Sequence, residues 1–187
     1  YERMTTNTPR IHRMTRTEAE ITKIALNCFL TTKISYANMI GDIVLRAGGE
    51  PSNVLHAIGA DTRVGNKYIE YGYGYGGPWF PRDNRALAIF AKAVKIDALI
   101  SLACDESNEK HLEYQLDFYE QNNSKNQQIC FETVTYKPES TMIVESQQLA
   151  FAAGLAERGY SVMIKERPSV IDAVRKIHGD LFIYEVR

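Results

Sequence analysis

The sequence lacks the features that mark membrane, secreted or nucleic-acid-binding proteins. Its longest uninterrupted apolar run, residues 86–91, is far shorter than the roughly 18 residues of a membrane-spanning helix. The polar start at residues 1–7 has no signal-peptide core. Lys and Arg together number 22 and Asp and Glu 23, so no strong field of one sign attracts nucleic acid or an anionic membrane. We therefore expect a soluble, cytoplasmic protein that binds neither of them.

Cysteine is also scarce. Cys28, Cys104 and Cys130 show no metal-type or CxxC spacing. An odd number of cysteines does not suit a disulfide framework, and 187 residues can bury a core without one. We expect three reduced, mostly buried thiols and no metal site.

The first two-thirds of the sequence predict helices. Apolar residues recur at intervals of three and four from Thr15 to Ala47, where two glycines stop a helix of roughly 30 residues. Thr17 and Glu20 fit a capping box near its start. Further helices are expected at 51–58, 84–94 and 99–119.

Beyond the polar segment 120–127 the pattern changes. Strands are expected at 129–135, 160–164 and 181–186, with helices at 142–158 and 169–177 between them. This alternation predicts a small parallel sheet, because parallel neighbours need a crossover. The expected fold class is mainly α, then α/β. We divide it into a linker at 1–14, an all-α domain at 15–120 and a small α/β domain at 127–187.

The long predicted helix carries two stripes. The apolar stripe predicts a homodimer built on this helix, because so small a domain cannot cover it. The polar stripe fits a solvated face with a Glu20–Lys23 pair, or a face that points Lys23 and Asn27 into a cleft, where they can stabilise an oxyanion. Periodicity leaves both interpretations open. The apolar stripe is Ile21, Ala25, Cys28, Thr32, Tyr36, Met39 and Ile43, and the polar one is Glu20, Lys23, Asn27, Thr31, Ser35, Asn38 and Asp42.

A glycine-rich segment, G-Y-G-Y-G-G-P-W-F-P-R-D, occupies residues 72–83. Its glycines allow a close approach of backbone to a ligand while aromatic rings pack on it. The pattern is neither a Walker loop nor a dinucleotide fingerprint. Asp83 fits either an N-cap of the helix predicted at 84–94 or a member of a site.

Several ordered motifs resemble the UDP-glucose/GDP-mannose (nucleotide-sugar) 6-dehydrogenase family, most closely its UDP-glucose members. They are residues 18–38, the run G-Y-G-G-P-W-F-P-R-D at 74–83, and Tyr136-Lys137-Pro138. The resemblance implies a helical dimerisation domain with one long helix, followed by a Rossmann-like UDP-binding domain that is shortened here. It also implies that residues 1–14 lead in from an NAD-binding domain that is missing.

The resemblance assigns roles to individual residues. Lys23 and Asn27 match residues that hold a catalytic water and stabilise oxyanionic intermediates, and Asp83 matches the aspartate that partners this water. Arg63 resembles an arginine that reaches the sugar nucleotide of the neighbouring subunit. The other implied substrate-binding residues are Tyr68, Tyr71, Gly72, Gly76, Gly77, Phe80 and Lys137. The implied reaction is the NAD-dependent oxidation of UDP-glucose to UDP-glucuronate through a thiohemiacetal and a thioester.

Trp79 stands where the family has its nucleophilic cysteine. Indole has no thiol, and its bulk is expected to fill the space for the sugar C6. Cys28 does not replace it, since it projects about 100° away from Asn27 on the same helix. Further departures are the absence of glycine at 131–135, Val144 in place of an arginine, and Lys165-Glu166-Arg167-Pro168 in place of Asp-Pro.

Two hypotheses follow from the sequence. The chain is the dimerisation and UDP-sugar-binding part of a nucleotide-sugar 6-dehydrogenase and does not turn over in isolation. Alternatively, it is a catalytically inactive relative that acts as a sugar-nucleotide-binding or dimeric interaction protein. The retained Lys23, Asn27, Arg63 and Asp83 favour the first hypothesis, whereas Trp79 and the NAD-binding domain expected to be missing favour the second.

Overall fold

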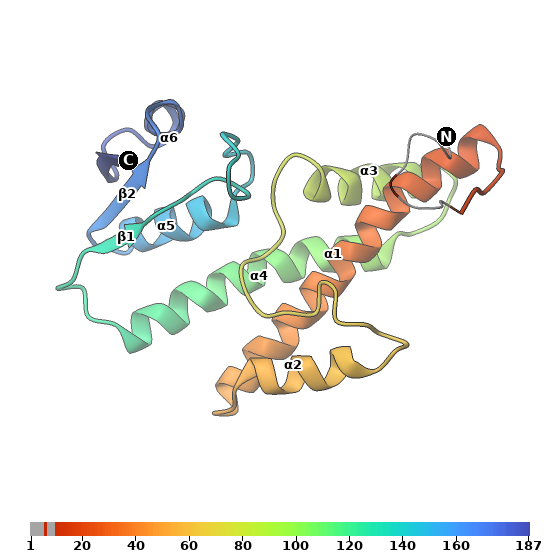
Figure 1. The fold of residues 1–187 in the computed structure, drawn as a ribbon, viewed down its shortest axis with the longest axis horizontal. Helices are drawn as coiled ribbons and strands as arrows, with labels where there is room; N and C mark the ends of the chain where they lie inside the picture. Colours follow the sequence, from red (N-terminus) through yellow and green to blue (C-terminus); the bar gives the residue numbers. More distant parts are fainter. Residues whose placement is uncertain (1–5, 7–9) are drawn as a thin grey trace.

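A computed structural model describes residue 6 and residues 10–187 of the chain, which form a helical unit and a smaller α/β unit (Figure 1). Of the linker expected at 1–14, residues 1–5 and 7–9 lie outside the described residues, and 10–14 form neither helix nor strand. None of the helices in the described part of the chain combines the length and the apolar character needed to cross a lipid bilayer.

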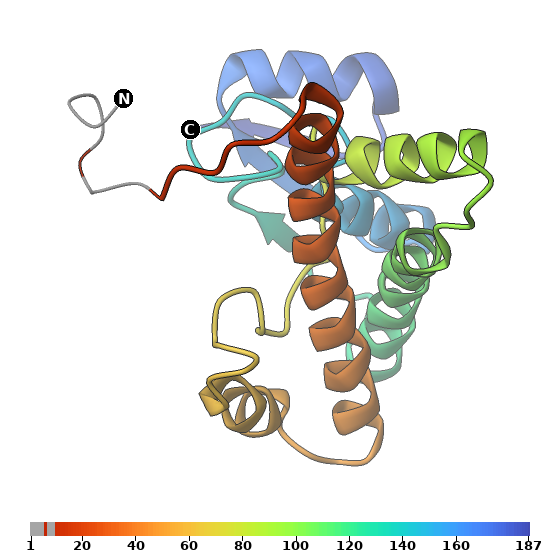
Figure 2. The same cartoon turned by 90° about the vertical axis from the view of Figure 1, so that its right-hand side faces the viewer.

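Helix α1 (Arg16–Arg46) is the spine of the helical unit (Figures 1 and 2). The Thr15 hydroxyl accepts a hydrogen bond from Glu18 N at 3.3 Å, while the Glu18 carboxylate accepts one from Thr15 N at 2.6 Å. This pair is the capping box, so the expected box of Thr17 and Glu20 is wrong. The Glu20 carboxylate instead pairs with the guanidinium of Arg16.

Three further helices pack around α1: α2 (Pro51–Ala60), α3 (Phe80–Ala93) and α4 (Leu99–Asn122). Helix α3 begins four residues earlier than predicted, because Pro81 suits the first helical turn. Trp79 therefore holds the N-cap position and Asp83 lies within the first turn. The N-cap interpretation of Asp83 is wrong, although its carboxylate still lies at the positive end of the helix dipole.

The α/β unit contains β1 (Ile129–Phe131), α5 (Gln147–Glu157), β2 (Val162–Glu166), α6 (Pro168–His178) and β3 (Ile183–Val186). The strands pair in the order β1-β2-β3, and both pairings are parallel. This confirms the fold class, mainly α and then α/β. The core beneath the sheet includes Leu155, Ile164, Val170 and Val174, and Leu116 of α4 reaches into it from the helical unit.

Strand β1 and helix α5 are shorter than predicted. The strand ends at Phe131 rather than at residue 135, and the helix begins at Gln147 rather than at residue 142. Ser146 caps the helix by accepting from Leu149 N at 3.3 Å, and Glu145 before it has a left-handed φ of 47°. Residues 132–146 therefore form the connection between β1 and α5 within the α/β unit, and they carry Lys137 and Glu145.

Candidate functional site

From Asn27 to Asn38 the polar stripe of α1 is a largely buried seam rather than a solvated face, whereas Glu20 and Lys23 before it are exposed. Its hydrogen bonds run from Asn27 to Asp83, from Thr31 to Asn84, from Ser35 to the Cys104 carbonyl, and from Asn38 to the Tyr73 carbonyl. The partners come from α3, from α4 and from residues 72–77, which we call the glycine loop. The expected Glu20–Lys23 pair does not form, because the Lys23 ammonium lies against Asp83 instead.

Lys23, Asn27 and Asp83 form one cluster between α1 and α3. Asp83 Oδ2 accepts from Lys23 Nζ at 2.8 Å and from Asn27 Nδ2 at 2.6 Å. Its other oxygen accepts from the Arg82 guanidinium at 2.7 Å. The side chain of Asp83 is 2% exposed, whereas that of Lys23 is 58% exposed. Lys23 and Asn27 therefore both point toward the start of α3, where Asp83 lies.

The surroundings of Asp83 keep its carboxyl ionised. Burial raises the pKa of this carboxyl, but hydrogen bonds from Lys23, Arg82 and Asn27 act against burial and bring the pKa below its usual range. A fixed carboxylate beside an ammonium and an amide can hold a water molecule and offer donors to a developing oxyanion. These are the groups that an oxidation through a tetrahedral intermediate uses.

Trp79 is 52% exposed, and two cations lie over its ring. The Arg82 guanidinium carbon is 4.5 Å from the ring centroid and Lys23 Nζ is 5.7 Å from it. The three cysteines are free, but only two of them are buried, since Cys130 is exposed. Burial raises the pKa of the Cys28 thiol, so this residue is not a ready thiolate.

A cavity of about 270 Å³ lies beside Trp79. Its other lining residues come from α1, the glycine loop, the start of α3 and the β1–α5 connection: Ile34, Gly74, Tyr75, Gly76, Phe80, Tyr136 and Lys137. A second hollow, of about 550 Å³, contains Lys23, Arg82 and Asp83. Because Trp79 lines the first space and contacts two cations of the second, it lies between them.

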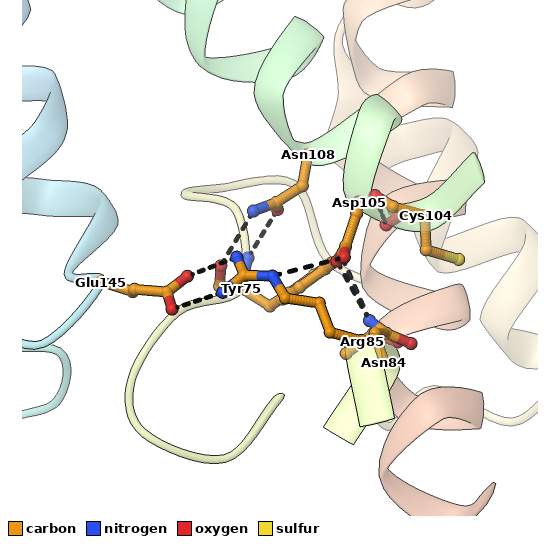
Figure 3. A network of polar contacts seen from close by, with 9 residues as sticks. Tyr75, Asn84, Arg85, Cys104, Asp105, Asn108 and Glu145 are labelled. Atoms are coloured by element: carbon orange, nitrogen blue, oxygen red, sulfur yellow. Dashed lines mark hydrogen bonds and ion pairs between the residues drawn. The ribbon is translucent and has the colours of Figure 1, made fainter. Parts of the chain in front are cut away.

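A polar network fixes the walls of this cavity (Figure 3). The Asn108 side chain bonds both backbone groups of Tyr75, each at 2.9 Å, and the Tyr75 hydroxyl donates to Asp105. Arg85 forks onto the two carboxylate oxygens of Glu145, both at 2.9 Å. The network joins α3, α4 and the glycine loop to the β1–α5 connection of the α/β unit, so the two units and the cavity between them are held together.

Not all of the predicted substrate-binding residues line the cavity. Gly76, Phe80 and Lys137 do. Gly77, with a left-handed φ of 80°, donates from its N–H to the Glu145 carbonyl at 3.4 Å. Tyr71 and Gly72 bond to α1 instead, through the Tyr71 hydroxyl to Asp42 and the Gly72 N–H to Asn38.

Arg63 and Tyr68 lie away from the cavity of their own chain. Arg63 pairs with Asp61 at 2.6 Å, and its side chain is exposed. Tyr68 is also exposed, with a left-handed φ of 66°. The resemblance directs Arg63 to a neighbouring subunit, so its role stays a prediction.

The sequence reasoning missed the residues that hold the glycine loop. On α4 these are Asn108, His111 and Gln115, which contact Tyr75 or Gly72. Their spacing of three and four residues was a readable signal of a polar face on that helix. On α3, Arg82 and Arg85 were also missed, and no periodic pattern marks either of them.

Comparison with known proteins places the chain in a family. Residues 17–110 match the family model described as "UDP-glucose/GDP-mannose dehydrogenase family, central domain". This chain belongs to the UDP-glucose/GDP-mannose dehydrogenase family. The match covers α1, α2, α3, the glycine loop and the first half of α4. It therefore includes Lys23, Asn27 and Asp83, but not Lys137.

Curated relatives and a solved structure agree with this family. UDP-glucose 6-dehydrogenase TuaD of Bacillus subtilis is 42% identical over 92 residues, which are 49% of this chain and 20% of TuaD. UDP-glucose 6-dehydrogenase AglM of Haloferax volcanii is 31% identical over 147 residues, 78% of this chain and 34% of AglM. A UDP-glucose dehydrogenase from the hyperthermophilic archaeon Pyrobaculum islandicum superposes with a TM-score of 0.80 at 32% identity, over 91% of this chain and 40% of that one.

The chain thus spans between 20% and 40% of the length of these relatives. The likeness to the Pyrobaculum structure extends beyond the central domain of the family, since it covers 91% of this chain. The α/β unit is therefore part of the family resemblance.

Proposed function

We propose that this chain is the dimerisation and sugar-nucleotide-binding part of a nucleotide-sugar 6-dehydrogenase that acts on UDP-glucose. The grouping of Lys23 and Asn27 on Asp83, next to a cavity walled by the glycine loop and Lys137, carries the proposal. In this assignment Lys137 attracts the diphosphate as a point charge, while glycine-loop backbone lies close to the ligand. Lys23 and Asn27 face the reacting carbon, and Asp83 orients a water.

We also propose that the chain does not complete the oxidation. The family scheme needs a thiolate that attacks an aldehyde, and Trp79 at this position has none. This observation also favours a second function, that of a catalytically inactive relative that binds sugar nucleotides or acts as a dimeric interaction protein. The two functions share one pocket and differ in what happens after binding.

The family resemblance implies NAD as the oxidant, bound mainly by a separate domain. In the described residues the segment after β1, Glu132-Thr133-Val134-Thr135, contains no glycine. A pyrophosphate approaches backbone closely at a glycine-rich strand–helix turn, and this segment does not provide one. We therefore assign no NAD contact to this segment.

Trp79 is expected to reverse the preference of the pocket for UDP-glucose over UDP. It lines the cavity beside Lys137 and occupies room that the hexose needs, so UDP should bind at least as tightly as UDP-glucose. Trp79→Cys should then improve UDP-glucose binding about tenfold relative to UDP, the equivalent of about 1.4 kcal/mol. Calorimetric titration of both ligands measures the ratio.

Ile89→Cys is the matched control, because Ile89 lies on the same helix, is exposed and does not line the cavity. It should leave the ratio unchanged. Tighter binding of UDP-glucose than of UDP by the unaltered chain contradicts the role given to Trp79. Absence of UDP binding altogether contradicts the proposed function.

A homodimer built on α1 is the second expectation. Phe29, Tyr36, Met39 and Ile43 follow one another at intervals of seven, three and four, and their exposed fractions lie between 44% and 62%. Such a stripe on a 31-residue helix suits the same stripe of a second copy. Light scattering at tens of micromolar should give twice the mass of one chain.

Tyr36→Glu should shift this mass toward that of one chain, since it places two like charges in the centre of the contact. Ile177→Glu on α6 is the control, because Ile177 is also exposed and lies on the α/β unit. A monomer mass for the unaltered chain that does not depend on concentration overturns the dimer.

A further inference from the structure

His111 is a buried histidine whose two ring nitrogens both face oxygen atoms. It lies on α4 and is 3% exposed. Nε2 lies 2.7 Å from the carbonyl oxygen of Gly72, and Nδ1 lies 2.8 and 3.0 Å from the carboxylate oxygens of Asp42. A carbonyl oxygen only accepts hydrogen bonds, so Nε2 must carry a hydrogen.

The other nitrogen, Nδ1, also carries a hydrogen. The Tyr71 hydroxyl lies 2.8 Å from Asp42, and burial, followed by this hydrogen bond, raises the pKa of Tyr71 far above its usual range. The hydroxyl is therefore neutral and donates to Asp42. Both carboxylate oxygens of Asp42 lie within 3.0 Å of Nδ1, and a carboxylate only accepts hydrogen bonds. A hydrogen on each ring nitrogen is the arrangement that satisfies all of these contacts, so the geometry assigns an imidazolium paired with Asp42.

The other titratable and charged groups around this pair fit that assignment. From the chain segment before the glycine loop, the Tyr71 ring meets His111 edge-on at 5.5 Å. From α4 itself, Tyr114 is neutral, because burial raises the pKa of its hydroxyl. From α1, Arg46 lies 5.2 Å from the Tyr114 ring centroid, and Asp42 supplies the negative charge.

The Gly72 carbonyl is one of the points where the glycine loop is fixed. It also accepts from Gln115 Nε2 at 3.1 Å, while the N–H of Gly72 donates to Asn38 at 3.1 Å. Two residues further on, Gly74 lines the cavity. One turn away on α4, Asn108 holds Tyr75. The position of the loop at the cavity therefore depends on donors from α4.

We propose that His111, as an imidazolium, is the positioning residue of the glycine loop, and that loss of one of its two ring hydrogens loosens the loop and weakens sugar-nucleotide binding. Only the weakening of sugar-nucleotide binding rests on the proposed function. A neutral ring would leave a lone pair facing either the Gly72 carbonyl or the Asp42 carboxylate, in a place that water does not reach.

Nitrogen NMR of the chain labelled with ¹⁵N-histidine tests the protonation state directly. Both nitrogens of His111 should show the shifts of protonated nitrogen in the folded protein, because each of them faces an acceptor. The exposed His12 and His56 are internal references. An unprotonated shift for either nitrogen of His111 overturns the proposal, whatever the chain binds.

His111→Gln tests the positioning, because one amide group cannot donate to both acceptors from that place. We expect the Gly72 and Tyr75 amides to exchange with solvent at least tenfold faster, and UDP affinity to fall about tenfold. His56→Gln, at an exposed position on α2, should change neither. Unchanged amide protection in folded His111→Gln overturns the proposal. If the amides exchange faster in His111→Gln but the unaltered chain binds no UDP, the positioning role of His111 is supported and the proposed function is contradicted.

If the His111→Gln variant does not fold, the unaltered protein provides the test. The pH of the unaltered protein is raised until the ring of His111 loses its second hydrogen, followed by NMR. Amide protection at Gly72, corrected for the intrinsic rate, should fall over the same pH range, while protection at Ala37 in the middle of α1 should not. Constant protection at Gly72 through that range overturns the proposal.

Discussion

Gly76→Ala is expected to destabilise the junction between the two units by about 3 kcal/mol. A Cβ atom at this position would lie 2.1 Å from the backbone oxygen of Glu145. This oxygen cannot withdraw easily, since it also accepts from the N–H of Gly77 and since the Glu145 side chain is held by Arg85. Denaturant unfolding of the unaltered protein and of the Gly76→Ala variant measures the difference in the free energy of unfolding.

Gly72→Ala is the matched substitution in the same loop. No heavy atom lies within 4 Å of its Cβ position, and its backbone is outside the left-handed region. Here the change should be neutral or stabilise by up to about 1 kcal/mol, because alanine restricts the unfolded chain. Equal losses for the two substitutions would contradict the close approach of Gly76 to Glu145.

The chain mixed with UDP-glucose and NAD is expected to form no NADH. The first hydride transfer needs bound NAD, and the described residues contain no glycine-rich strand–helix turn to hold its pyrophosphate. In the family scheme the second transfer needs a thioester, which Trp79 cannot form. Cys28 and Cys104 are buried, and Cys130 lies on β1 in the other unit. Absorbance at the NADH band over several hours, with an intact relative such as TuaD as the positive control, measures the effect.

NADH formation alone would not overturn this expectation, because a contaminating dehydrogenase also produces it. The decisive variant is Lys23→Ala, which removes the ammonium beside Asp83 and leaves any contaminant unaffected. Activity that disappears with Lys23→Ala would show that the site works without a cysteine at position 79. Activity that persists unchanged would belong to another protein.

Much of the fold could be predicted because local patterns determine it. The spacing of apolar residues located α1, α2 and α4, and the alternation after residue 127 predicted the parallel sheet. The grouping of Lys23, Asn27 and Asp83 came from motifs rather than from spacing, since Asp83 is 56 residues from Asn27. No helical period connects positions that far apart.

What could not be predicted depends on partners distant in the sequence. The start of α5 depends on Glu145, whose left-handed backbone coincides with its ion pair to Arg85 on α3. The polar stripe of α1 could be assigned to one face, but whether that face meets water depends on α3, α4 and the glycine loop. His111 showed no signal by itself, because its chemistry comes from Asp42 and Gly72.

The buried polar seam of α1 also fixes the alignment of this helix against the rest of the helical unit. Apolar side chains tolerate a slide of one helix past another by a turn of about 5.4 Å, because one methyl group replaces its neighbour. The seam does not, since the same slide would part Thr31 from Asn84 and Asn38 from Gly72 at once. Each buried group left without a partner costs about 1–3 kcal/mol. The seam thus contributes more to the specificity of the fold than to its stability. It raises the free energy of shifted alignments of α1 by more than it lowers that of the native one.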